Sequence, residues 1–77
     1  MKDDKRRPIP YLRAWRLHKL LKQVELAQQA GVGEQTIIRL EQGGRANELT
    51  IHKLARALEV SVRQLEEEAP PEKVRAA

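Results

Sequence analysis

Few side chains in this 77-residue chain have the types and spacing that catalysis or metal binding requires. There is no cysteine, and the single serine is better explained as a helix cap. Aspartate occurs only at Asp3 and Asp4, while His18 and His52 stand alone on helical segments, and the glutamate run at 66–68 is most simply a solvated helix end. We therefore predict that the protein is not an enzyme and has no catalytic residues, metal site or cofactor.

The remaining candidates for a function are the positively charged Lys and Arg side chains. The net charge is +4 and the sequence pI is about 9.9. Residues 1–22 hold eight Lys and Arg against two Asp, a net of +6, whereas residues 23–77 carry a net of −2. This distribution points to a polyanionic partner, with Lys5, Arg6 and Arg7 of the N-terminal segment as phosphate-binding candidates. A solvated basic tail is the alternative interpretation of the same segment.

The composition predicts one small all-α domain. Hydrophobic residues make up 40% and charged residues 34%, and a chain with one Trp, one Tyr and no Phe must build an aliphatic core. No apolar run approaches the roughly 18 residues of a membrane span, and the N-terminus lacks a signal-peptide hydrophobic region. We expect a soluble, cytoplasmic protein with no membrane partner, organised as a basic flexible arm (1–9), a folded domain (10–68) and a disordered tail (69–77).

Apolar spacing and end signals predict five helices, over residues 11–20, 22–30, 34–42 and 48–59 and in a short segment after Ser61. Gly31 follows the last apolar position of the second helix, where the chain usually turns left-handed. Asn47 is the expected cap of the fourth helix. Ser61 and Gln64 have the spacing of a capping box at the start of the fifth.

Helical spacing also predicts which side chains form the core. Trp15 is expected to be the core anchor of the first helix. The third helix should turn Ile37, Leu40 and Glu41 inward and the following residues outward: Glu34, Gln35, Ile38, Arg39 and Gln42. The fourth helix is expected to bury Leu49, Ile51, Leu54, Ala55 and Leu58.

The central stretch resembles the phage repressor and Cro family of helix-turn-helix DNA-binding domains, also described as XRE-like. The resemblance covers residues 12–65 and rests on these motifs: Leu21-x-Gln23-x-Glu25-Leu26-Ala27, Gly31-Val32-Gly33, Ile37 with Leu40-Glu41-x-Gly43, and Leu54-Ala55-x-Ala57-Leu58-x-Val60. It implies a compact five-helix, repressor-like fold whose recognition helix, about 34–42, lies in the major groove of DNA.

The resemblance also assigns base-reading positions to four residues: Glu34, Gln35, Ile38 and Arg39. Gln35 is suited to adenine and Arg39 to guanine, while Ile38 is suited to a thymine methyl group. Glu34 has two open interpretations, because it either accepts a hydrogen bond from cytosine or only stabilises the helix dipole.

Phosphate contacts are implied for Gln23, Thr36 and Arg45. Gln23 stands at the start of the second helix, where free backbone N–H groups favour anions, and there it would also brace the first residue of the recognition helix. A first-turn residue that only meets solvent is the alternative for Gln23. Thr36 is expected to touch the DNA backbone, and Arg45 follows the recognition helix directly.

An internal ion pair between Arg16 and Glu41 is also implied by the resemblance. Both charges stand at otherwise inward-facing positions, so they are expected to be buried together. Two residues depart from the family's pattern. Lys22 occupies the usual Ser/Thr-like cap of the second helix and has no acceptor, and Leu20 stands where a glycine often ends the first helix.

The predicted function is sequence-specific binding of double-stranded DNA as a small transcriptional regulator. A homodimer on a two-fold operator is expected, with half-sites about one helical turn apart and the fifth helix near the dimer contact. The alternative keeps the fold but makes it a protein-interaction module, such as an antitoxin-like partner or coactivator, that uses exposed Leu17, Leu20 and Val62. The sequence leaves open the operator and whether the regulator activates or represses.

Overall fold

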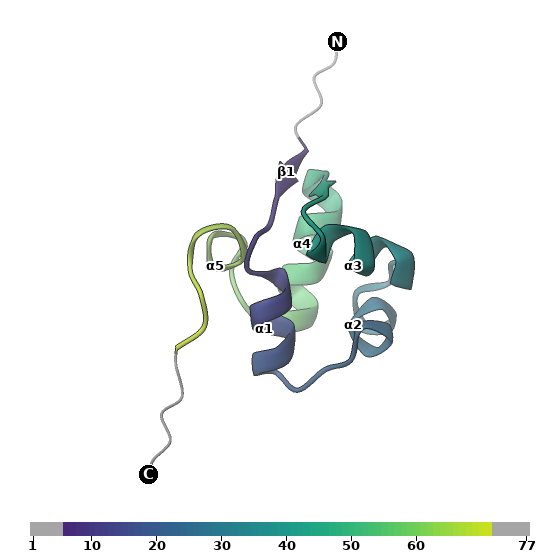
Figure 1. The fold of residues 1–77 in the computed structure, drawn as a ribbon, viewed down its shortest axis with the longest axis horizontal. Helices are drawn as coiled ribbons and strands as arrows, with labels where there is room; N and C mark the ends of the chain where they lie inside the picture. Colours follow the sequence, from purple (N-terminus) through teal and green to yellow (C-terminus); the bar gives the residue numbers. More distant parts are fainter. Residues whose placement is uncertain (1–5, 72–77) are drawn as a thin grey trace.

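The computed structural model describes residues 6–71. Within them lie five helices and one two-stranded antiparallel sheet, in this order: β1 (Arg7–Pro8), α1 (Leu12–His18), α2 (Gln23–Ala30), α3 (Glu34–Glu41), β2 (Arg45–Ala46), α4 (Glu48–Leu58) and α5 (Val62–Glu67). Figure 1 shows α2 and α3 on one side of the molecule and α5 on the other. The prediction of an all-α, five-helix domain is confirmed, with the small sheet as an addition.

The core is aliphatic and draws on all five helices, as the composition predicted. Its largest fully buried side chains are Ile9, Leu12, Leu26, Ile37, Ile51, Leu54, Leu58 and Leu65. Trp15 is also buried, and its Nε1–H donates to the carbonyl oxygens of Gln64 and Glu68 at 3.1 and 2.8 Å. Trp15 therefore anchors α1 to the end of α5, which confirms it as a core residue.

Two predictions about apolar side chains were wrong. Leu49 is 64% exposed, because the buried stripe of α4 runs through Ile51, Leu54, Ala55 and Leu58. At roughly 100° per residue, Leu49 points almost opposite to Ile51. Val62 was expected to be exposed but packs against the core, whereas Leu17 and Leu20 are exposed as predicted.

The predicted helix caps of α4 and α5 are both confirmed. The Asn47 Oδ1 accepts a hydrogen bond from the Thr50 N–H at 2.9 Å. In the capping box, the Ser61 Oγ accepts from the Gln64 N–H at 3.1 Å, and the Gln64 Oε1 accepts from the Ser61 N–H at 2.8 Å. Each cap satisfies backbone donors that the first turn of a helix leaves unpaired.

Leu20 adopts the left-handed conformation that a glycine would take more easily. Its φ is 61°, and its side chain is 89% exposed. A bulky L residue in this region is disfavoured by roughly 1–2 kcal/mol, because its Cβ crowds the following carbonyl. The turn between α1 and α2 keeps this geometry through hydrogen bonds from the Leu20 and Leu21 N–H groups to the carbonyls of Leu17 and Arg16.

The N-terminal segment is more structured than predicted. The interpretation of residues 1–9 as one flexible arm is wrong for residues 7–9, because Arg7 and Pro8 pair with Ala46 and Arg45 in the sheet. Ile9 is only 2% exposed and belongs to the core. Lys5 and residues 72–77 of the predicted tail lie outside the described residues.

Candidate nucleic-acid interface

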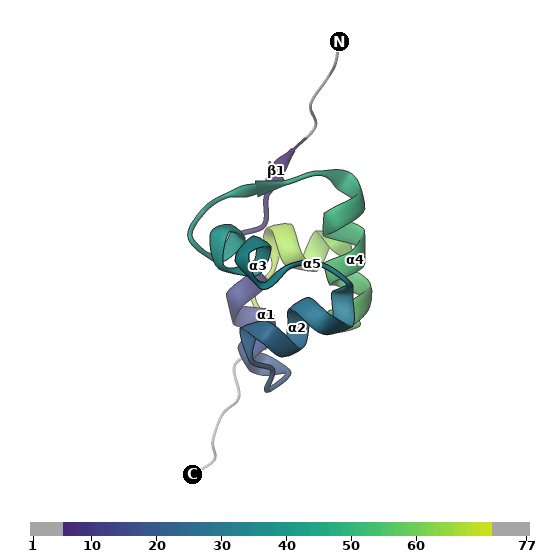
Figure 2. The same ribbon diagram turned by 90° about the vertical axis from the view of Figure 1, so that its right-hand side faces the viewer.

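The helix-turn-helix is formed by α2, a three-residue turn and α3. Gly31 takes a φ of 76°, and the N–H groups of Gly31 and Val32 both donate to the Ala27 carbonyl, at 2.9 and 3.0 Å. Val32 packs against the core from within the turn. Gly33 is extended and is the N-cap residue of α3. In Figures 1 and 2, α3 lies next to α2 at one side of the molecule.

The outward side of α3 carries the predicted base-reading residues. Glu34, Gln35 and Arg39 are exposed, and Ile38 is half-buried. Ile37 and Leu40 are buried on the opposite side, as helical spacing predicted. An apolar inner face and a polar outer face on one helix leave the outer side chains available to a ligand.

A hollow of about 190 Å³, here called the arginine hollow, lies beside this outward side. Its lining residues are Arg6, Thr36, Arg39, Arg45, Ala46, Asn47 and Thr50. Three arginines thus line one hollow together with two threonines and an asparagine, and among the lining residues in the described part of the chain none carries a carboxylate. Guanidinium forks match phosphate oxygens bidentately, so the hollow has the chemistry of a phosphate site.

Gly44 fixes the distance between α3 and the strand that follows it. A Cβ at this position would lie 2.9 Å from the Arg39 carbonyl oxygen and 3.0 Å from the Arg39 Cγ. The Gly44 N–H donates to that same carbonyl at 3.0 Å, and the Arg39 Nη1 reaches the Arg45 carbonyl at 3.5 Å. The close approach that only glycine permits therefore brings Arg39 and Arg45 together.

Arg7 does not line the arginine hollow, although it was predicted to bind phosphate. Its Nη1 lies 2.6 Å from the Glu48 Oε1, and its Nε donates to the Glu66 carboxylate. These hydrogen bonds raise the pKa of Arg7, and Arg7 together with His52 lowers the pKa of Glu48. The predicted phosphate contact of Arg7 disagrees with this arrangement, because both ends of its fork already face carboxylates.

The implied ion pair of Arg16 and Glu41 is present and ties three helices together. The Arg16 Nε lies 2.6 Å from the Glu41 Oε2, with the two side chains only 9% and 5% exposed. Gln23 donates its Nε2 to the Glu41 Oε1 at 3.0 Å. Gln23 thus braces the last residue of α3, whereas the sequence predicted a brace to the first. The start of α2 is completed by Glu25, whose carboxylate accepts from the Lys22 N–H at 2.7 Å.

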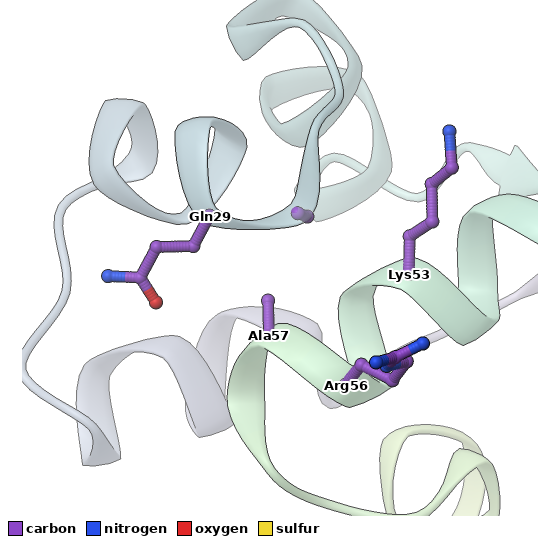
Figure 3. Close-up of a pocket in the computed structure, with 5 residues that line it drawn as sticks. Gln29, Lys53, Arg56 and Ala57 are labelled. Atoms are coloured by element: carbon purple, nitrogen blue, oxygen red, sulfur yellow. The ribbon is translucent and has the colours of Figure 1, made fainter.

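A second hollow, of about 360 Å³, lies between the end of α2 and α4 (Figure 3). It is lined by Gln29, Ala30, Lys53, Arg56 and Ala57. Figure 3 shows the short side chain of Ala57 and the longer polar side chains of Gln29, Lys53 and Arg56. It shares no residue with the arginine hollow.

Sequence reasoning missed the contributions of Gly44, Asn47 and Thr50 to the interface. Asn47 carried only a cap signal and Gly44 only a helix-stop signal. Their role depends on a fold that brings β1, α3, β2 and the start of α4 together, which no local pattern reveals.

Residues 6–71 contain no helix that is long and apolar enough to cross a membrane. They also contain no group of three or more His, Cys, Asp and Glu residues placed to hold a metal ion.

The fold and the outward polar side of α3 define a helix-turn-helix protein. The helix-turn-helix family HTH_3 matches residues 12–65, which is most of the chain, so the chain belongs to this family. This confirms the XRE-like resemblance. No curated protein sequence is significantly similar to the chain.

Solved structures resemble the chain over most of its length. A hypothetical transcription factor NHTF from Neisseria is 31% identical with a TM-score of 0.70, over 78% of this chain and 69% of that one. The master regulator for biofilm formation SinR, in complex with DNA, is 27% identical with a TM-score of 0.67, over 70% and 89%. These neighbours and the family support a non-enzymatic DNA-binding transcription regulator.

One structural neighbour is an enzyme. Streptomyces albus HEPD, with 2-hydroxyethylphosphonate and Fe(II) bound, is 34% identical with a TM-score of 0.68, over 71% of this chain. The match spans only 13% of the HEPD chain. The likeness therefore concerns a small part of that enzyme.

Proposed function

We propose that this chain binds double-stranded DNA sequence-specifically, as a small transcriptional regulator with α3 in the major groove. The observation that carries the proposal is the position of the arginine hollow directly beside the exposed side of α3. The major groove of B-DNA admits an α-helix, and phosphates line both of its edges. The family match and the likeness to SinR, which was solved with DNA, support this reading.

Base reading is assigned to the outward side of α3. Gln35 is suited to a bidentate contact with adenine and Arg39 to one with guanine, while Ile38 offers methyl groups to thymine. Glu34 accepts from cytosine in this scheme. Arg39 starts from a defined orientation, because its Nη1 already faces the Arg45 carbonyl.

Phosphate binding is assigned to the residues around this helix. Arg6, Arg45 and Thr36 line the arginine hollow and supply charged and hydroxyl donors. Gln23 uses one amide hydrogen on Glu41 and keeps the second for a phosphate. Lys5 directly precedes Arg6 in the sequence and adds to the same basic segment.

The regulator is proposed to act as a homodimer. One recognition helix of eight residues reaches only a few base pairs, so two copies on a two-fold operator gain both affinity and length of site. The half-sites then lie about one helical turn apart.

Selection from a random duplex library tests this proposal. We expect a two-fold symmetric consensus and an affinity that falls steeply with salt. Gln35→Ala should relax the base preference at one position of the consensus. Arg45→Ala should weaken the binding of all DNA sequences alike and lower the salt dependence of the affinity, as a log–log slope, by about 1. The proposal fails if no consensus emerges and the affinity is independent of salt, and a stoichiometric protein partner in that case would favour the interaction module.

A further inference from the structure

We propose that Arg7, Glu48 and Glu66 are positioning residues that hold Arg6 at the arginine hollow, so that two carboxylates strengthen the binding of DNA. The inference rests on the proposed function, because the ligand of the hollow is the phosphate backbone of a duplex. It gives Arg7 a role other than the direct phosphate contact predicted from the sequence.

The register of the small sheet decides which way each arginine points. Arg7 pairs with Ala46, and Pro8 pairs with Arg45. Side chains alternate between the two faces of a strand, and directly paired residues share a face. Ala46 is buried and Arg7 is half-buried, whereas Pro8 and Arg45 are exposed. Arg6 therefore shares the outward face of Arg45, where both line the hollow.

A shift of the register by one residue would reverse this arrangement, because it moves every side chain of the strand to the other face. The sheet has only two residues in each strand, and so short a two-stranded ribbon is not stable by its own hydrogen bonds. Contacts outside the ribbon must hold it.

Two such contacts follow Arg6 in the chain. In the farther one, Ile9 is buried in the core, and the Tyr11 N–H donates to the Leu65 carbonyl at 3.2 Å. Ile9 is three residues from Arg6, too far along the chain to set the direction of its side chain.

The nearer contact is made by Arg7 itself. Its Nη1 lies 2.6 Å from Glu48 at the start of α4, and its Nε donates to Glu66 on α5. A guanidinium fork between two carboxylates on different helices fixes both the position and the rotation of the strand. With Arg7 held inward, the next residue along the strand is directed outward to the hollow.

This positioning role predicts a change in DNA affinity that is opposite in direction to the change expected from net charge. Removing a carboxylate from a DNA-binding protein ordinarily strengthens its attraction to phosphates. If Glu66 positions Arg6 through Arg7, its removal weakens binding instead. Glu67 provides a matched control, because it carries the same charge on the next residue of α5 and, like Glu66, lines a hollow together with Arg6, but pairs with Arg63 at 3.3 Å and not with Arg7.

The test measures the affinity of the full chain for its selected duplex, at one low salt concentration, in four variants. We expect Arg6→Ala to lower the affinity about tenfold, the range of one charge-assisted hydrogen bond. Glu66→Gln should lower it about three- to tenfold, and Glu67→Gln should leave it unchanged or slightly raised. In an Arg6→Ala background, Glu66→Gln should have no further effect.

Arg7→Lys provides a second test of the positioning role. Lysine keeps the charge but loses the fork, so it should weaken binding when Arg6 is present and not when Arg6 is alanine. The inference would be overturned, and the proposed function would stand, if Glu66→Gln bound DNA more tightly. The same holds if the losses of affinity caused by Arg6→Ala and Glu66→Gln added fully in the double variant. Absence of salt-dependent binding by the unmodified chain would overturn the proposed function as well.

Discussion

Glu41→Ala is expected to destabilise the domain more than any change on its surface. The Glu41 carboxylate accepts hydrogen bonds from the Arg16 Nε and Nη2 at 2.6 and 3.1 Å and from Gln23 at 3.0 Å. After the substitution, the buried guanidinium keeps only the Leu21 carbonyl, at 2.8 Å from its Nη1. Leaving a buried charge without its partner costs about 3–5 kcal/mol.

That loss is large for a chain of this size. A domain of 77 residues is expected to have a free energy of unfolding of about 4–12 kcal/mol. Each kcal/mol shifts the melting temperature by about 4–8 °C, so Glu41→Ala should lower it by more than about 12 °C. Urea titration followed by circular dichroism and by the fluorescence of Trp15 measures the loss directly.

Glu67→Ala is the control, because the Glu67 side chain is 62% exposed and pairs with Arg63 at the surface. Its effect should stay within about 1 kcal/mol. Replacing both members of the buried pair by apolar residues, as in Arg16→Met with Glu41→Leu, should recover most of the loss. Equal unfolding midpoints for Glu41→Ala and Glu67→Ala would refute the reasoning.

Three further predictions concern backbone geometry and pH. Leu20→Gly should stabilise the domain by up to about 1 kcal/mol, because glycine relieves the left-handed strain, and an unchanged or lower urea midpoint would contradict this. Gly44→Ala should cost about 1–3 kcal/mol and weaken DNA binding, because the new Cβ meets Arg39, whereas the open position Gly33 should tolerate alanine in both assays. Glu48, whose folded pKa is lowered, should contribute stability fully above about pH 4.5, its usual pKa, and lose that contribution as the pH falls through the folded value. The gap between unfolding midpoints of the unmodified chain and Glu48→Gln should therefore close in acid, and a constant gap would argue against the prediction.

The helix boundaries and caps were predictable because their signals are local. Ser61 and Gln64 are three residues apart, and Gly31 directly follows the last apolar position of α2. Each signal acts between residues that are close in the sequence, so it predicts a helix end without knowledge of the fold. The outward side of α3 was predictable for the same reason, because helical periodicity fixes it.

The sheet and the arginine hollow were not predictable in this way. Ile9 between two prolines gives no periodic pattern, so nothing in the sequence marks it as a core residue. The pairing of Arg7 with Ala46 joins segments far apart in the chain and involves two residues on each side. Arg7 and Arg6 look alike in the sequence, and only the register of the sheet places Arg7 between two carboxylates and Arg6 at the arginine hollow.

The two sides of α3 make specificity and folding separable properties. Glu34 and Gln35 have no side-chain hydrogen bond or ion pair with residues 6–71, whereas Glu41 on the same helix joins three helices. A library randomised at positions 34 and 35 should therefore stay folded while its members prefer different DNA sequences. The domain offers a scaffold whose target can be redirected without rebuilding its core.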